Sequence, residues 1–319
     1  MFTQEIMSKK FIIRISNELG NQLFMYASSF AMAKKLNRIL LVDDETAYLS
    51  KKNISSYCLN NFEITSDIAN NSNKYLGLIG YLKRKILKKI NFFLKNKIFY
   101  IEPKSIQKIT KYNDEIYSFN LSKNVYLEGN FETEKYFNHI KDDIKSEFSF
   151  LNIEQFKKSF FYEKLNKRNS VSICLRQNRF IEGKNQYNEL NKLKSEQFKN
   201  EQIKYINKAM HFIKNKINDP SFYLWSNDLY NFDISKFDFQ VTKVMHDDKI
   251  LSNIDKRVLD LFLITQCNHH IVIPSSFNWW GAWLCKKKDK IICRPNDSFF
   301  SDFKVNNKDF WPSNWNEIS

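Results

Sequence analysis

A strand, turn, helix, strand pattern near the amino end constrains the fold of this chain more than any other feature. Residues 11–15 (Phe-Ile-Ile-Arg-Ile) form a short apolar run, and residues 39–42 (Ile-Leu-Leu-Val) repeat that composition. Between them, a turn that contains Gly20 leads into a segment of helical spacing that ends near Leu36. Two strands joined through a helix run parallel. The pattern therefore predicts a βαβ unit.

The same alternation continues along the chain and predicts two domains. Further strands are expected at 124–128, 170–175, 222–225 and 271–273, and helices at about 133–148, 195–216 and 255–267. Alternating strands and helices favour an α/β fold with parallel sheets. The polar stretch 157–169 suits a crossover between two such units. We therefore place the domains at residues 1–155 and 156–319, with an insertion at about 78–100.

Polar residues follow several of the predicted strands, where parallel sheets bind their ligands. Arg176 follows the strand at 170–175, and a guanidinium binds phosphate oxygens in a bidentate, permanently charged manner. Ser275 and Ser276 stand where a strand passes into a helix, and a helix amino end favours anions. Taken alone, the tryptophans at 279, 280 and 283 are better explained as buried core.

Two distant motifs and the segments between them resemble one enzyme family. Residues 20–27 read Gly-Asn-Gln-Leu-Phe-Met-Tyr-Ala, and residues 275–282 read Ser-Ser-Phe-Asn-Trp-Trp-Gly-Ala. Segments 57–64, 128–137 and 222–228 add weaker matches in the same order. The chain is similar to the bacterial α-1,2-fucosyltransferases of glycosyltransferase family 11. The resemblance implies a GT-B fold, in which two Rossmann-like domains face a cleft. The first domain then lies on the acceptor side, and the second binds the nucleotide sugar.

The resemblance also implies an activity and a set of site residues. The activity is inverting, metal-independent transfer of fucose from GDP-fucose to the 2-hydroxyl of a galactose-like residue, in O-antigen or capsule biosynthesis. No cofactor is expected, and the adjacent pairs of aspartates, such as Asp43-Asp44, do not form the Asp-x-Asp motif of metal-dependent transferases. Arg176 matches the family arginine that contacts the diphosphate. The expected donor-binding residues are Gly20, Asn21, Gln22, Arg176, Arg179, Ser226, Asn227, Asp228, Ser275, Ser276 and Phe277.

Four positions depart from the family pattern. Cys174 replaces a histidine, Gln177 replaces a second arginine, Arg179 replaces an aspartate, and Asn227 replaces the first residue of an aspartate pair. We hypothesise that Arg179 restores the phosphate-binding charge that is missing at Gln177. These departures leave open a transferase that uses another nucleotide sugar, or a non-catalytic glycan- or membrane-binding protein of the same fold.

Inversion at the anomeric carbon needs a base that takes the proton of the acceptor hydroxyl. The aspartate of the family pattern is Arg179 here, so it cannot serve. Glu132, Glu182 and Asp228 remain as candidates. We name Glu182 with Arg176 among the expected catalytic residues, and the choice of base among the three carboxylates stays open.

The net charge of +15 predicts an acidic partner. Basic residues gather between positions 81 and 100, where no acidic residue occurs, and apolar residues recur there at helical spacing. Such a segment is typical of a helix on an anionic membrane surface; a solvated helix packed on its domain is the alternative. The basic residues that would contact the membrane are Lys83, Arg84, Lys85, Lys88 and Lys89.

No nucleic-acid-binding module accompanies the charge, so no nucleic acid partner is expected. The sequence has no apolar run long enough for a signal peptide or a membrane span, and its five cysteines include no Cys-x-x-Cys pair. These features predict a cytoplasmic protein. The resemblance further implies a peripheral position at the inner face of the cell membrane and a galactose-containing, lipid-linked glycan as acceptor.

Overall fold

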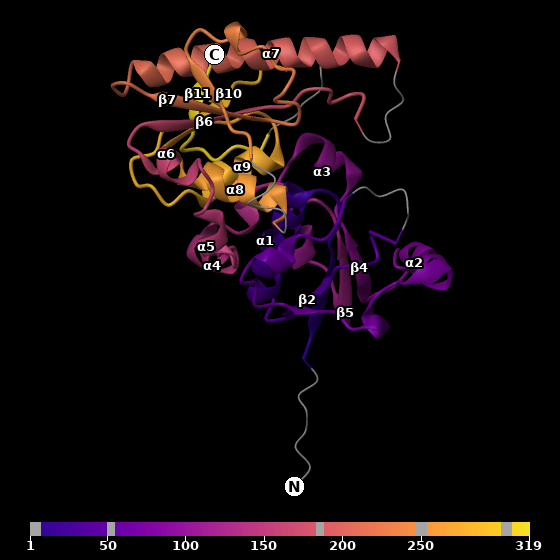
Figure 1. The fold of residues 1–319 in the computed structure, drawn as a ribbon. Coiled ribbons are helices and arrows are strands. Elements are labelled where there is room, and N and C mark those ends of the chain that lie inside the picture. The colour runs from indigo at the N-terminus through magenta and orange to yellow at the C-terminus, as the bar shows by residue number, and fades with distance from the viewer. Residues whose placement is uncertain (1–7, 50–54, 183–187, 247–253, 301–307) are drawn as a thin grey trace. The chain divides into compact units, whose positions relative to one another are not determined.

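The computed structural model describes residues 8–49, 55–182, 188–246, 254–300 and 308–319. The chain forms two compact units, Met1–Ser149 with Asn307–Phe310, and Phe150–Asn306 with Trp311–Ser319 (Figure 1). The division after Ser149 precedes residue 155, where the sequence suggested it. Phe150 belongs to the second unit because its ring packs against Phe156 and Phe262, with centroids 6.1 and 5.4 Å away.

A short segment near the carboxyl end returns to the first unit. The Asp309 carboxylate accepts a hydrogen bond from the backbone N–H of Tyr112 at 2.7 Å, and it forms an ion pair with Lys135 at 2.6 Å. Its own backbone N–H donates to the carbonyl of Thr110 at 3.0 Å. The ring of Phe310 lies 6.1 Å from that of Phe24. The sequence alone gave no indication of this return.

The first unit is built on a parallel sheet with strand order β3-β2-β1-β5-β4. Figure 1 shows α1 beside one face of this sheet and α2 beside the other. The predicted βαβ unit is confirmed, since β1 pairs with β2 in parallel. The strands are β1 (Lys10–Arg14), β2 (Ile39–Asp43), β3 (Asp67–Ile68), β4 (Lys97–Ile101) and β5 (Leu121–Glu128), and the α-helices are α1 (Leu19–Lys35), α2 (Gly77–Ile90), α3 (Lys104–Ile109) and α4 (Lys141–Glu147).

The helix predicted at 133–148 is instead broken into three pieces, η4 (Glu134–Tyr136), η5 (Asn138–Ile140) and α4. Tyr136 and Phe137 are both buried, although they are neighbours in the sequence. A regular helix would turn them about 100° apart, whereas the two short turns allow both rings to enter the core.

The second unit has a parallel sheet with strand order β11-β10-β9-β6-β7-β8. Figure 1 shows α7 along one face of the sheet, with α6, α8 and α9 on the other. The central strand β6 coincides with its prediction, because its six residues are all buried and apolar or small. The elements are β6 (Ser170–Leu175), β7 (Ser221–Ser226), β8 (Val241–Lys243), β9 (His269–Ile271), β10 (Ile292–Pro295), β11 (Asn316–Ile318), α5 (Ile153–Phe156), α6 (Tyr162–Asn166), α7 (Glu189–Lys214), α8 (Lys256–Gln266) and α9 (Ser276–Leu284).

Candidate functional site

The carboxyl ends of β6 and β7 lie side by side, and Gln177 ties them together. Its backbone N–H donates to Asn227 Oδ1 at 2.7 Å, and Asn227 Nδ2 donates to its carbonyl at 2.9 Å. Its side-chain amide donates to Ser226 Oγ at 3.1 Å and to the carbonyl of Asp228. The Asp228 carboxylate accepts a weak bond from Asn231 Nδ2 at 3.3 Å. Gln177, which replaces a family arginine, is thus the buried link between two predicted donor-binding segments.

Arg176 projects from a fixed main chain. Gln202 on α7 is completely buried, and its amide accepts from the Arg176 N–H at 2.9 Å and donates to the Arg176 carbonyl at 2.8 Å. These two bonds hold the backbone, while the side chain of Arg176 keeps 46% of its surface exposed. The structure therefore presents one accessible guanidinium at the carboxyl end of the central strand.

A tight turn brings Glu182 back to Arg176. Asn178 has φ 57°, in the left-handed region, and its carbonyl accepts from the N–H groups of Ile181 and Glu182 at 3.0 and 3.1 Å. Glu182 Oε2 then lies 2.8 Å from Arg176 Nη2, and Glu182 Oε1 accepts from Asn227 Nδ2. The carboxylate neutralises the guanidinium, so an anion that binds Arg176 competes with Glu182.

Arg179 reaches from the loop after β6 to the loop after β9. Its guanidinium lies 4.8 Å over the ring of Phe198, and its Nη1 donates a long bond of 3.4 Å to the carbonyl of Pro274. Pro274 directly precedes the Ser275-Ser276 pair. The structure thus brings Arg179 beside the predicted phosphate-binding serines, whereas its role toward phosphate stays a prediction.

The serine pair stands at the amino end of α9. Ser275 is the N-cap residue in extended conformation, and its hydroxyl makes no capping hydrogen bond. Ser275, Ser276 and Phe277 are half-buried, whereas Trp279 and Trp280 are completely buried. The tryptophans are therefore core, as the plainer interpretation held, and the residues before them remain accessible at the helix start.

The close packing of α8 against α9 requires a glycine at position 281. A Cβ atom at this position would lie 2.4 Å from Ile264 Cγ2 on α8. That contact is far shorter than van der Waals packing allows. The glycine therefore lets α8 and α9 pack closely, and this packing sets the position of the serine turn.

The first unit places Gly20 and Asn21 inside the first turn of α1. The helix begins at Leu19, and the left-handed residue of the preceding turn is Asn17 (φ 65°) rather than the glycine. Asn21 Nδ2 donates to Glu132 Oε1. One predicted donor-binding residue and one candidate base therefore contact each other at the carboxyl edge of the first sheet.

The buried side chain of Gln22 hydrogen-bonds to the backbone around the start of α1. It has no exposed surface, and its Nε2 donates to the carbonyls of Asn17 and Ser56 at 2.9 and 2.8 Å. Its Oε1 accepts from the N–H of Cys58 at 2.9 Å. These bonds join the β1–α1 turn to a later loop, so Gln22 has a structural role, and its contact with the donor stays a prediction.

Sequence reasoning named Glu132 but missed Glu102, which holds the loop that carries Glu132. Glu102 follows β4, is 3% exposed, and accepts from the N–H groups of Asn130 and Phe131 at 2.7 and 3.1 Å. Burial raises the pKa of Glu102, and the two backbone donors oppose that rise. A Cβ at Gly129 would lie 2.5 Å from Glu102 Cβ, so glycine is required there. The signal available in the sequence was this glycine in a chain that has only six.

Cys174 occupies the family histidine position near the end of β6. Burial first, and then the nearby charge of Asp260, raise the pKa of the thiol far above its usual range. Asp260 in turn accepts from His246 Nε2 at 2.6 Å, and His246 follows β8. A neutral thiol thus stands where the family has an imidazole, and Asp260 pairs with His246, a pairing that the sequence did not predict.

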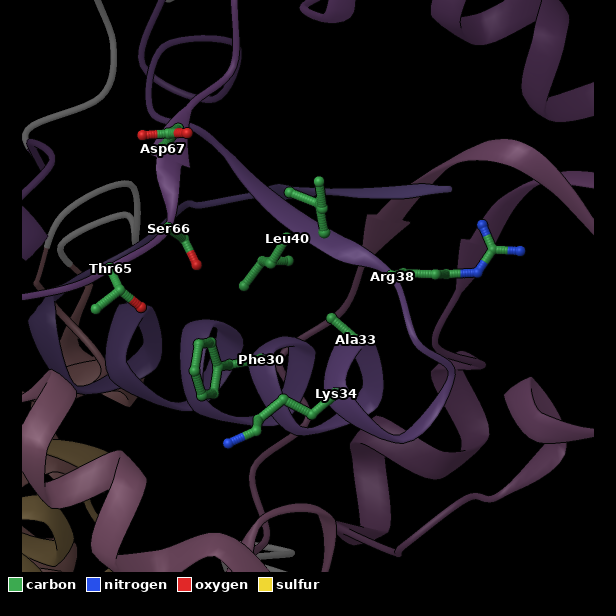
Figure 2. A pocket seen from close by; sticks show the side chains of 9 residues that line it. Phe30, Ala33, Lys34, Arg38, Leu40, Thr65, Ser66 and Asp67 are labelled. Atoms are coloured by element: carbon green, nitrogen blue, oxygen red, sulfur yellow. The ribbon is translucent and has the colours of Figure 1, made fainter. Parts of the chain in front are cut away.

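A pocket of about 180 Å³ in the first unit lies away from these residues (Figure 2). Phe30, Ala33 and Lys34 of α1 form one wall, and Thr65–Asp67 form another. Its lining includes Leu40 near the start of β2, which is the amino edge of the sheet. Ligands of parallel sheets bind at the carboxyl edge, so this pocket is separate from the candidate site.

Two properties of the described residues concern metal binding and membrane insertion. Across the described ranges, no three His, Cys, Asp or Glu residues gather in a way that could hold a metal ion. Within the same part of the chain, no helix has the length and apolarity needed to cross a bilayer. Independence from metal stays a prediction.

Two solved structures share this architecture. The NodZ alpha-1,6-fucosyltransferase co-crystallised with GDP superposes with a TM-score of 0.53 at 15% identity, covering 86% of this chain and 91% of that one. A mutant of Arabidopsis thaliana FUT1 in complex with GDP gives a TM-score of 0.50 at 11% identity, covering 93% and 73%. The predicted fold class, α/β of the GT-B type with two Rossmann-like units, is confirmed.

Sequence relatives then define the family. The chain belongs to glycosyl transferase family 11, which matches residues 2–319, and it is therefore a glycosyltransferase. An alpha-1,2-colitosyltransferase of Escherichia coli is 24% identical, with 96% of this chain and 98% of the relative covered. The O-antigen biosynthesis glycosyltransferase WbnK of Escherichia coli is 25% identical, with 91% and 95% covered. The predicted family is confirmed.

Proposed function

We propose that this protein transfers fucose from GDP-fucose to the 2-hydroxyl of a galactose-like residue, with inversion and without a metal. The observation that carries the proposal is Arg176, an accessible guanidinium on a main chain fixed by Gln202 at the carboxyl end of β6. A cation at this point meets the need of the reaction, because a diphosphate leaving group gains charge as the sugar departs.

The proposed reaction is a single displacement at the anomeric carbon. The acceptor oxygen forms the new bond as the bond to the GDP oxygen breaks, and the bonding electrons leave with GDP. Arg176 stabilises the charge on the diphosphate, and Arg179 adds a second cation from the same loop. Glu182 is displaced from Arg176 by the diphosphate and takes the proton of the acceptor hydroxyl. Glu132 and Asp228 are the reserve candidates for this base.

The remaining proposed donor contacts come from three further segments of the chain. In the second unit, Ser226 ends β7 and Asn227 and Asp228 follow it, while Ser275 is the N-cap residue of α9 and Ser276 and Phe277 begin that helix. In the first unit, Gly20 and Asn21 lie in the first turn of α1. Helix amino ends and small hydroxyls favour the phosphate groups of a nucleotide sugar.

A second donor is favoured by one comparison. The relative that is 24% identical is named for transfer of colitose, and the chain departs from the fucosyltransferase pattern at Cys174 and Asn227. A colitosyl nucleotide is therefore the second candidate donor. Since the WbnK relative is named for O-antigen biosynthesis, we propose a cytoplasmic role in surface polysaccharide assembly, on a galactose-containing, lipid-linked glycan.

The test is calorimetric binding of GDP-fucose, the colitosyl nucleotide and other nucleotide sugars, in the presence of a chelator. Arg176→Ala should weaken binding of the true donor by about 10- to 150-fold, the range expected for hydrogen bonds to a charged group. Arg168→Ala is the matched control, because Arg168 is exposed just before the other end of β6. Preference for a nucleotide other than these two contradicts both donor assignments, and equal binding by Arg176→Ala contradicts the phosphate role.

A measurement of turnover distinguishes an enzyme from a non-catalytic binding protein. A transferase hydrolyses its donor slowly or glycosylates a galactoside, whereas a binding protein releases no GDP. Release of GDP that depends on a galactoside supports the proposal, and donor binding without any release contradicts it. Linkage at another hydroxyl of the product would refute the 2-hydroxyl assignment alone.

A further inference from the structure

The apolar stripe of α2 faces away from the first unit. The stripe consists of residues spaced by three and four positions on one side of the helix and its C-terminal turn. In a helix packed on its own domain, such a stripe faces the core. Here its members are all exposed: Ile79 (83%), Leu82 (47%), Ile86 (56%), Ile90 (43%) and Phe93 (84%).

Buried ion pairs hold the helix in this orientation. Arg84 Nε and Nη2 contact Glu128 Oε1 and Oε2 at 2.5 and 2.8 Å, and Lys88 Nζ contacts Oε2 at 2.7 Å. Burial alone would raise the pKa of Glu128, but these hydrogen bonds outweigh it and lower the pKa. Leu87 packs against the core cluster that contains Phe99. The side of α2 that carries Arg84, Leu87 and Lys88 therefore points inward.

This orientation revises the set of membrane-contacting cations. Arg84 and Lys88 were predicted to bind the membrane, but both are engaged with Glu128. Lys83, Lys85 and Lys89 are exposed, as is Lys95 beyond the helix. Among the described residues these four lysines form no hydrogen bond or ion pair. They border the apolar stripe, which Leu78 (74%) and Phe92 (79%) extend.

We propose that this surface of α2 inserts its apolar stripe into the interface of an anionic bilayer, with the lysines at the headgroups. An apolar centre with a cationic rim matches such a surface. A second copy of the chain is a poorer occupant, because the lysine rims would face each other in a protein of net charge +15. Attachment of this kind is independent of the transferase assignment.

The size of the effect follows from the same residues. A lysine near an anionic leaflet contributes about five-fold in partitioning, the equivalent of about 1 kcal/mol. Replacing three lysines should therefore weaken binding by about 100-fold. Ile79 and Phe93 are the most exposed members of the stripe, and replacing both by serine should weaken binding by at least about ten-fold.

The experiment is flotation of the full chain with phosphatidylcholine vesicles, with and without phosphatidylglycerol. The variants are Ile79→Ser/Phe93→Ser and Lys83→Gln/Lys85→Gln/Lys89→Gln. The control Leu190→Ser/Tyr230→Ser removes two side chains of similar exposure, 73% and 82%, in the second unit. Thermal melting verifies that each variant is folded.

Binding that requires phosphatidylglycerol, is weakened by both α2 variants and survives in the control supports the proposal. Equal flotation of wild type and Ile79→Ser/Phe93→Ser overturns it, as does equal binding to neutral vesicles. Analytical sedimentation measures the oligomeric state of the wild type and of the variants. A dimer that the Ile79→Ser/Phe93→Ser variant dissociates would assign the surface to a protein contact and overturn the bilayer assignment.

Discussion

Replacing Glu182 with glutamine separates two roles of this side chain. In the structure the carboxylate neutralises Arg176, and in the proposed reaction it takes the proton of the acceptor hydroxyl. Glutamine keeps the length of the side chain and an oxygen that can accept from Asn227 Nδ2. It removes both the negative charge and the basic group, so the local turn is preserved while the chemistry changes.

The two roles predict effects of different size and on different quantities. The Arg176–Glu182 ion pair at 2.8 Å joins side chains that are 46% and 30% exposed, so its strength is at most about 1 kcal/mol. Freeing Arg176 should therefore tighten donor binding by no more than about five-fold. Loss of a general base should lower kcat by about 10²- to 10⁴-fold.

The assay combines donor binding by calorimetry with kcat for fucosyl transfer to a galactoside. Glu163→Gln serves as the control, because Glu163 is an exposed carboxylate of α6 in the same unit. A variant of Glu182 that binds donor at least as well and turns over about 100-fold more slowly fits the assignment. A kcat within about three-fold of wild type would refute the base role and leave Glu182 as a partner of Arg176.

Two further predictions concern stability. Gly129→Ala should lower the free energy of unfolding in urea by about 2–3 kcal/mol, because the added Cβ would lie 2.5 Å from Glu102 Cβ. Gly77→Ala meets open space and only a φ of +64° opposes it, so this variant should lose about 1 kcal/mol, and equal losses in the two variants would count against the clash. Burial, followed by nearby positive charges, depresses the pKa of His270 well below its usual value in the folded state, so the unfolded state binds the extra proton first. The stability of the wild type is then full above about pH 6.5 and falls below it, by up to about 1.4 kcal/mol per pH unit. His270→Gln should reduce the dependence of stability on pH, measured by thermal melts between pH 7 and 5. The control is His139→Gln, at an exposed histidine, and a pH dependence that changes only in this control would contradict the prediction.

The regular part of the fold could be predicted because its signals are local. β6 is a continuous run of small and apolar residues, and such a run is buried on both faces of a parallel sheet. The edge strands β3, β8 and β11 are two or three residues long and were not foreseen. Segments this short carry no periodicity, and their pairing depends on a neighbouring strand.

The candidate site was predictable as a set of strand ends but not as a network. Arg176 could be named from its position after a strand, yet its partner Glu182 is fixed by a left-handed turn at Asn178. Gln177 looked like a lost cation and proves to be the bridge between β6 and β7. Hydrogen-bond partners on other elements are chosen in three dimensions, and residue types alone do not encode them.

The sequence by itself determined the α/β alternation, the family and the amphipathic character of α2, because each rests on residue types at fixed spacing. Only the tertiary structure decided which side of α2 is outside. The helical spacing is the same whether the apolar stripe faces the core or the solvent. The choice depends on Glu128, a residue of β5 far along the chain, whose buried carboxylate binds Arg84 and Lys88 and leaves the stripe exposed.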